Sequence, residues 1–203
     1  MSDSNEEAQS VIEEWFGPNP SPSVWPDAMA KRWWTKDAAY DESLRTRFGA
    51  LLDRALEGEL DAWADTTHGA VALIILLDQF SRNIHRGTPR AFAADPKALA
   101  LARQLSVAPG FHDLPGYMQA FAGMPFMHAE SKEAQREGQM FFRALAERAR
   151  PEFADKLRGN VEFMDKHAVI VERFGRFPHR NEILGRVSTE EEIEFLKEPG
   201  SSF

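Results

Sequence analysis

A stretch rich in arginine and side-chain amides, residues 76–94, contains the residue types best suited to binding a charged ligand. Its sequence is LLDQFSRNIHRGTPRAFAA. If this stretch is an α-helix, four polar side chains at i, i+3, i+4 and i+7 share one face of about 80°. They are Gln79, Arg82, Asn83 and Arg86. Because the arginine fork matches carboxylates and phosphates through paired hydrogen bonds, this face is predicted to bind an anion.

The other polar residues of this stretch are expected on a different face. A third arc of the helix, away from the four polar side chains of the predicted anion-binding face, is typical of a solvated flank. It contains Asp78, Ser81 and His85. Between Asp78 and Asp95 there are three arginines and no acidic residue, although the chain as a whole has a net charge of −8. This local reversal of charge is the first indication of function.

A second basic stretch lies between residues 167 and 186. Gly175 and Pro178 interrupt the helical pattern there, so its side chains can converge from different backbone directions. Phenylalanines adjoin the arginines, and an unpaired charge in apolar surroundings is costly, so each arginine is expected to have a partner or a ligand. The predicted ligand-binding residues of this stretch are Arg173, Arg176, Arg180, Asn181 and Arg186.

Four further side chains could transfer protons in such a site. They are His128, Glu130, His167 and His179. Histidine titrates near neutral pH and so suits general acid or base chemistry. For His167, which shares an apolar stripe with Phe163 and Ile170, the alternative is a buried histidine bonded to a backbone carbonyl. The chain has no H-E-x-x-H or H-x-H pattern and no phosphate-binding glycine loop, so neither a metal nor a cofactor is expected.

These residues predict a pocket for a small carboxylate or phosphate molecule, or for the acidic end of a peptide. Hydrolysis or isomerisation without a cofactor is compatible with positioned arginine and histidine. One alternative is a tetratricopeptide-like scaffold that binds a peptide on its concave face. Another is a purely structural role, in which every arginine pairs with an acid. If the pocket exists, Arg82→Ala and Arg176→Ala should abolish ligand binding and leave folding largely intact.

The elements that position these residues are predicted to be helices. Apolar residues recur at intervals of three and four in residues 48–56, 99–105, 141–145 and 153–164. Proline and glycine interrupt the pattern at residues 17–22, 87–89, 108–110 and 178. We predict one all-α domain, residues 1–203, with about seven to nine helices in antiparallel hairpins, stacked as a tetratricopeptide-like superhelical array.

Two local features refine this prediction. The proline-rich residues 17–22 follow only about 16 residues, too few for a separate core, and are interpreted as a bend between the first two helices. Ser188 and Glu191 have capping-box spacing, which indicates a helix start. Tryptophans in the first 34 residues are expected to anchor the N-terminal helices in the core: Trp15, Trp25, Trp33 and Trp34.

Composition excludes several classes of protein. With 24 basic and 32 acidic residues, the chain repels nucleic-acid backbones and anionic membrane surfaces. The absence of cysteine excludes disulfides, iron–sulfur clusters and a cysteine nucleophile. The longest apolar run, residues 70–77, is too short to span a bilayer. The first residues, MSDSNEEAQS, lack the basic and apolar regions of a signal peptide, so a cytoplasmic location is expected.

The motifs also resemble those of a bacterial family known as domain of unknown function 924. The resemblance rests on residues 76–102, 124–131 and 167–196, and residues 11–16 and the Trp33–Trp34 pair fit it too. It implies an all-helical, tetratricopeptide-like fold and a bacterial source, and it implies no established activity. The family's motif positions coincide with the candidate residues selected above for ligand binding and proton transfer.

Overall fold

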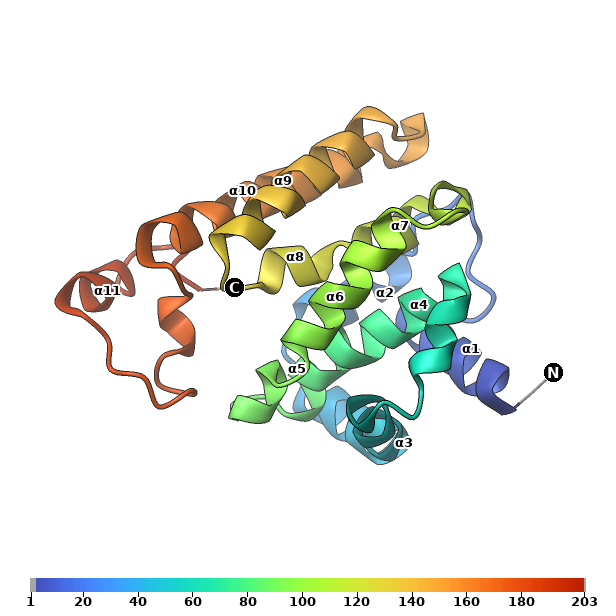
Figure 1. Cartoon of the computed structure of the whole chain (residues 1–203), viewed down its shortest axis with the longest axis horizontal. Coiled ribbons are helices and arrows are strands. Elements are labelled where there is room, and N and C mark those ends of the chain that lie inside the picture. The colour runs from blue at the N-terminus through green and yellow to red at the C-terminus, as the bar shows by residue number, and fades with distance from the viewer. Residues whose placement is uncertain (1–2, 203) are drawn as a thin grey trace.

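A central helix forms the core of the structure, a computed structural model that describes residues 3–202 (Figure 1). This helix consists of α4 (Thr67–Ile74), a π-helical segment (Ile75–Phe80) and α5 (Ser81–Ile84), without a break. Residues 70–77 are at most 4% exposed, because neighbouring helices cover every side of it. No helix within the described residues is both long and apolar enough to cross a membrane.

Four helices surround this core: α1 (Asp3–Phe16), α3 (Ala38–Glu57), α6 (Asp95–Ser106) and α7 (Gly116–Ala122), each of which packs against the central helix. Of these, α3 and α6 contain the apolar stripes predicted at residues 48–56 and 99–105. The short α2 (Asp27–Trp34) follows the predicted proline-rich bend. No strand occurs between residues 3 and 202, so the predicted all-α class is confirmed.

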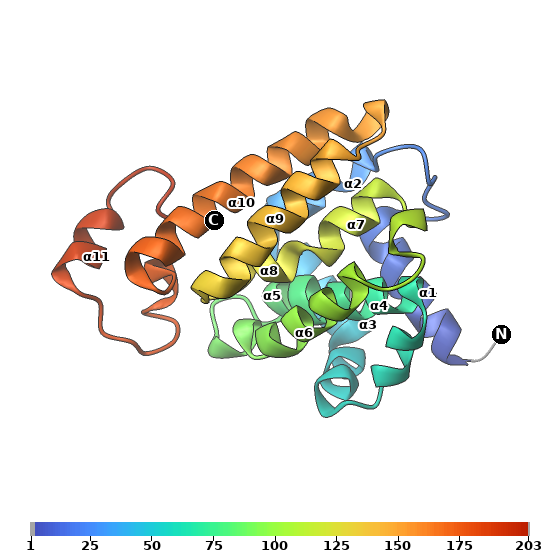
Figure 2. The same cartoon turned by 45° about the horizontal axis from the view of Figure 1, so that its top comes forward.

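A helical hairpin covers one side of this core. Helix α9 (Lys132–Glu147) and helix α10 (Ala154–Phe174) lie side by side in both views (Figures 1 and 2). The short α8 (Met124–His128) packs against both of them and against α6. The Ser131 hydroxyl caps α9 by accepting a hydrogen bond from the Ala134 amide, and α10 ends at Gly175, whose φ of 71° glycine tolerates best.

The C-terminal segment, residues 175–202, extends beyond one end of the hairpin (Figures 1 and 2). It contains a 3₁₀ turn, Pro178–Arg180, and helix α11 (Glu190–Phe195). Thr189 and Glu192 form a complete capping box at the start of α11, one residue later than the predicted Ser188 and Glu191. Further 3₁₀ turns lie at Asp61–Asp65, Pro89–Phe92, Phe111–Asp113 and Pro151–Phe153.

Of the N-terminal tryptophans predicted to anchor the core, Trp15 is buried, Trp25 and Trp33 are half-buried against it, and Trp34 is exposed. Trp15 is buried at the centre of an aromatic cluster, and Trp33 donates from its indole N–H to the Trp15 carbonyl at 2.9 Å. Trp34 is 68% exposed, so its predicted role as a core anchor is wrong. It lies at the end of α2, a helix with no buried residue, and stacks one face on Phe121.

Two glycines in the hairpin provide a test of its packing. A Cβ at Gly138 in α9 would lie 2.7 Å from the Met164 sulfur and 2.8 Å from Phe126 Cβ, whereas a Cβ at Gly159 in α10 meets nothing within 4 Å. Gly138→Ala should lower the free energy of unfolding by about 1–3 kcal/mol through overpacking. Gly159→Ala should raise it by about 0.5–1 kcal/mol. Urea denaturation measures both, and a stabilising Gly138→Ala would contradict the packing described.

Candidate functional site

A wholly buried carboxylate, Asp78, lies at the centre of the candidate site. The Nδ1 of His128 contacts its two oxygens at 2.8 and 2.9 Å, and the Gln79 amide donates to it at 2.6 Å. Arg82 forms an ion pair with it at 3.0 Å. Burial alone would raise the pKa of Asp78, but the charge of Arg82 and the contacts with His128 and Gln79 hold that pKa below its usual value. Asp78 is therefore ionised.

The burial of Asp78 corrects the predicted solvated flank. Asp78 is inaccessible to solvent and Ser81 is 1% exposed. Two physical reasons explain the difference. Other helices cover this helix on all sides, and its π-helical segment, with hydrogen bonds from i to i+5, shifts the faces that an uninterrupted α-helix would present. The Ser81 hydroxyl donates instead to the backbone carbonyl of Ala91 at 3.2 Å.

His128, the last residue of α8, is held as a neutral base. Burial and the nearby charge of Arg82 lower the pKa of His128, and the opposing effect of Asp78 is smaller. Because Asp78 is ionised and accepts, Nδ1 of His128 carries the proton and donates it to Asp78. Nε2 is then the unprotonated nitrogen. The side chain is 18% exposed, so a small molecule can approach it.

Asp95 joins the two basic stretches. It is the first residue of α6, and Arg82 donates to it at 3.0 Å while Arg180 does so at 3.4 Å. The Arg180 guanidinium lies over the rings of Phe92 and Phe177, 4.6 Å from each centroid. Arg180 is 5% exposed, and its Nε has no hydrogen-bond partner. Burial and the neighbouring charge of Arg82 lower the pKa of Arg180 to about 10.

The other predicted histidines lie around this centre. Nδ1 of His167 donates to the Phe163 carbonyl at 2.7 Å, the backbone bond expected of a core histidine, and its ring centroid lies 6.3 Å from that of His128. His179 packs against Phe177. Burial is the main cause that lowers the pKa of His167 to about 3 and that of His179 to about 4. Both histidines are therefore neutral at pH 7.

Glu130 holds the C-terminal segment against the rest of the protein. Its carboxylate accepts from the Phe177 backbone amide at 2.7 Å and from two nitrogens of Arg186 at 2.6 and 2.8 Å. Burial would raise the pKa of Glu130, and these hydrogen bonds lower it below its usual value. Because Phe177 precedes the turn that carries Arg180, this contact positions Arg180 beside Arg82.

The remaining predicted residues serve other contacts. The carboxylate of Asp41 in α3 accepts hydrogen bonds from both Asn83 and Arg86. Asn83 donates at 2.8 Å, and two nitrogens of Arg86 donate at 2.5 and 2.9 Å. They therefore attach the central helix to α3 and do not join Arg82. Arg173 pairs with Glu191 at the surface, at 2.8 Å.

Glu192 is the centre of the contacts that fasten α11. Arg176 donates to it at 2.6 and 2.8 Å, and Asn181 donates to it at 3.2 Å. These bonds, Arg176 foremost, outweigh burial and lower the pKa of Glu192 to about 2. Asn181 also accepts from Arg186 at 3.0 Å. Every predicted arginine of both stretches thus has an acidic partner, as the purely structural alternative expects, and Arg180 has the weakest contact.

Sequence reasoning missed the acids that organise this arrangement, Asp78 and Asp95. A signal for Asp78 was present, because it directly follows a run of eight apolar residues, 70–77. Asp95 carried no such signal, since an acid before proline at a helix start is ordinary. Among residues 3–202, no group of three or more acids and histidines is arranged to hold a metal ion.

Comparisons with known proteins agree with the fold. A family model described as a bacterial protein of unknown function (DUF924) matches residues 11–200. A solved structure of a protein of unknown function from Agrobacterium tumefaciens is similar, with 33% sequence identity and a TM-score of 0.80. The match covers 96% of this chain and 99% of that one. No curated protein matches the chain.

The burial of Asp78 reverses the expectation that Arg82 can be removed without cost. Arg82→Met leaves a buried carboxylate without its cation, so the free energy of unfolding should fall by about 3–5 kcal/mol. Arg180→Met removes a weakly paired buried cation, and Asp95 retains its ion pair with Arg82. The free energy of unfolding should therefore fall by less than about 1 kcal/mol, or increase. Chemical denaturation of both variants measures the contrast; equal losses would contradict it.

Stability should fall as the pH is lowered from 7 to 4. The unfolded chain protonates its histidines near pH 6.5, whereas folding holds the pKa of His167 at about 3 and that of His179 at about 4. The unfolded state therefore binds more protons than the folded state in this pH range. Each of the two histidines should lower the free energy of unfolding by about 1.4 kcal/mol for each pH unit of acidification. His167→Asn should reduce the dependence of the free energy of unfolding on pH. The control variant is His68→Asn, at the exposed start of α4. An unchanged profile in His167→Asn would contradict this origin.

Proposed function

Because the chain belongs to the DUF924 family of bacterial proteins of unknown function, we propose its function from its own site: it binds a small carboxylate or phosphate at Arg82 and Arg180, beside His128. The observation that carries the proposal is the state of Arg180. This buried guanidinium has one hydrogen bond to Asp95, at 3.4 Å, and a buried Nε without a partner. A buried cation with so few contacts is costly, and an anion would supply the missing acceptors.

The access to these groups supports a ligand of small size. The side chains of Arg82, His128 and Asp95 are 17–18% exposed, so each presents some surface while most of it is buried. Charge-assisted hydrogen bonds are strongest where water is largely excluded. An anion here would meet guanidinium groups from two distant parts of the chain, fixed in place by Asp95.

The neighbouring imidazole gives this site a means of proton transfer. Asp78 holds His128 by its Nδ1–H, so Nε2 can accept a proton from a bound molecule and the imidazolium formed is stabilised by the carboxylate. Arg82 and Arg180 would stabilise negative charge that develops on the substrate. Hydrolysis or isomerisation of an anionic molecule, without a cofactor, is the chemistry that these residues support.

A thermal-stability titration tests the binding proposal. Inorganic phosphate and malonate are compared with sodium chloride at equal ionic strength. A ligand at a hundred times its dissociation constant should add about 2.7 kcal/mol to the free energy of unfolding. Arg180→Gln should abolish this gain because it removes the under-bonded guanidinium. Arg173→Gln, which alters an exposed arginine paired with Glu191, should retain it.

The same titration separates the alternatives. Equal stabilisation of wild type and Arg180→Gln by phosphate and malonate would contradict the proposed site. A peptide ending in two aspartates is the third probe. Stabilisation by this peptide alone would favour the tetratricopeptide-like scaffold that binds a peptide end over a small-molecule site.

A further inference from the structure

A cavity of about 290 Å³ lies near the end of the hairpin formed by α9 and α10. Its walls come from the loop before α7, from the end of α9 and from the start of α10. Most of the side chains that form its interior are apolar: Phe111, Leu114, Phe141, Leu145, Phe153 and Leu157. This volume is at the small end of the range for ligand pockets, which suits a molecule of few heavy atoms.

Two arginines line the same cavity, Arg148 and Arg150, and both are exposed. Arg148 donates to Nε2 of His112 at 3.2 Å, so that this ring nitrogen acts as an acceptor. Within the part of the chain that the structure describes, neither arginine forms an ion pair, in contrast to the arginines of the two basic stretches. The cavity thus combines a largely apolar interior with two arginines that are free of ion pairs, and its lining also includes one carboxylate, Asp113.

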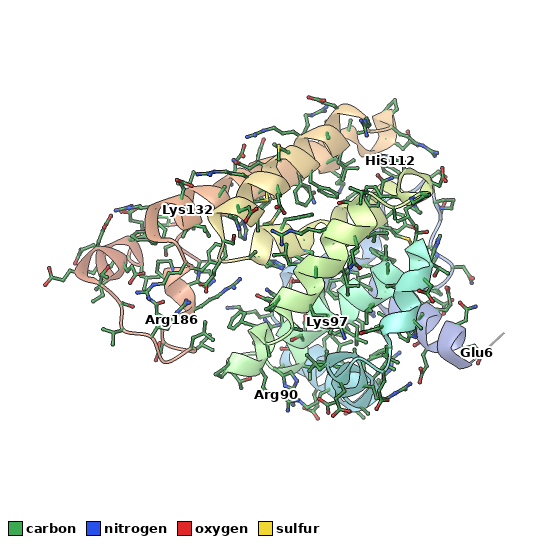
Figure 3. All side chains as sticks on the ribbon, in the orientation of Figure 1. Glu6, Arg90, Lys97, His112, Lys132 and Arg186 are labelled. Carbon is green, nitrogen blue, oxygen red and sulfur yellow. The ribbon has the colours of Figure 1, made fainter. Side chains whose placement is uncertain are left out.

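This cavity is separate from the site at Arg82 and Arg180. In Figure 3, His112 lies at the upper right and Arg186 lies well away from it, toward the left. Lys132, at the start of α9, is nearer to Arg186. Helix α9 has 16 residues and so spans roughly 24 Å between its two ends. Glu130, which binds Arg186, precedes one end of α9, and Arg148 follows the other.

We propose that this cavity binds an amphipathic carboxylate, with its short apolar chain among the phenylalanines and leucines and its carboxylate at Arg148 and Arg150. The apolar walls favour burial of methylene groups, and each buried methylene should tighten binding about fourfold. The arginines distinguish a carboxylate from an uncharged molecule of the same length, because charge-assisted hydrogen bonds are stronger than neutral ones.

Isothermal titration calorimetry with hexanoate, octanoate and octan-1-ol tests the proposal on the full chain. Octanoate should bind about 15-fold more tightly than hexanoate, because it has two more methylenes, each worth about fourfold. It should also bind more tightly than octan-1-ol. The double variant Arg148→Gln with Arg150→Gln should remove the preference for octanoate over the alcohol. Arg143→Gln is the matched control, since this α9 arginine pairs with Asp165 and does not line the cavity.

A second variant tests the location. Ala144→Phe places a ring in the cavity wall and should abolish binding of both octanoate and octan-1-ol. Unchanged octanoate affinity in Ala144→Phe, or an unchanged preference for octanoate in the double arginine variant, would overturn the proposal. Arg180→Gln should leave octanoate binding unaffected, so failure here and failure of the proposed function are distinguished.

Discussion

A carboxylate buried in the central helix imposes the constraint from which the arrangement of the site follows. An ionised group without access to water is stable only with cations and hydrogen-bond donors around it. Asp78 obtains them from Gln79 beside it, from Arg82 one turn later and from His128 at the end of α8. The carboxylate therefore fixes the orientation of an arginine and an imidazole at one place, where both remain partly exposed.

The C-terminal segment depends on the same set of charges. Arg82 binds Asp95 as well as Asp78, and Asp95 in turn contacts Arg180 on the segment that follows α10. Glu130 fastens this segment through the Phe177 amide and through Arg186. Most cations in this region thus satisfy acids and hold the fold. Arg180 differs, because it is buried with too few acceptors, and this imbalance is the physical basis of the proposed anion site.

The helices were predictable from the sequence because their apolar residues recur with helical spacing, as in α3, α6, α9 and α10. The convergence of Arg82 with Arg180 was also predicted, but the grouping of Arg86 with Arg82 was not correct. A helical projection at a constant angle per residue places Arg86 on the face of Arg82, whereas Arg86 binds Asp41 of α3.

The limits of prediction were set by long-range contacts and by one local irregularity. The π-helical segment at Ile75–Phe80 changes which residues point inward, and no pattern in the sequence marked it. Asp41 and Asp95 lie far along the chain from their partners, and only the packing of α3 and α6 brings them close. Tertiary structure therefore decides which arginine has too few acceptors, and the sequence pattern does not show it.

The protonation state of His128 decides whether Asp78 holds a neutral base beside an anion site. Nitrogen-15 NMR of the histidine side chains at pH 7 should show His128 neutral, with its proton on Nδ1 and with a pKa below the usual value of about 6.5. Addition of inorganic phosphate should shift its Nε2 resonance. An imidazolium at pH 7, a proton on Nε2, or a resonance insensitive to phosphate and to malonate would contradict an Asp78-held base beside an anion site.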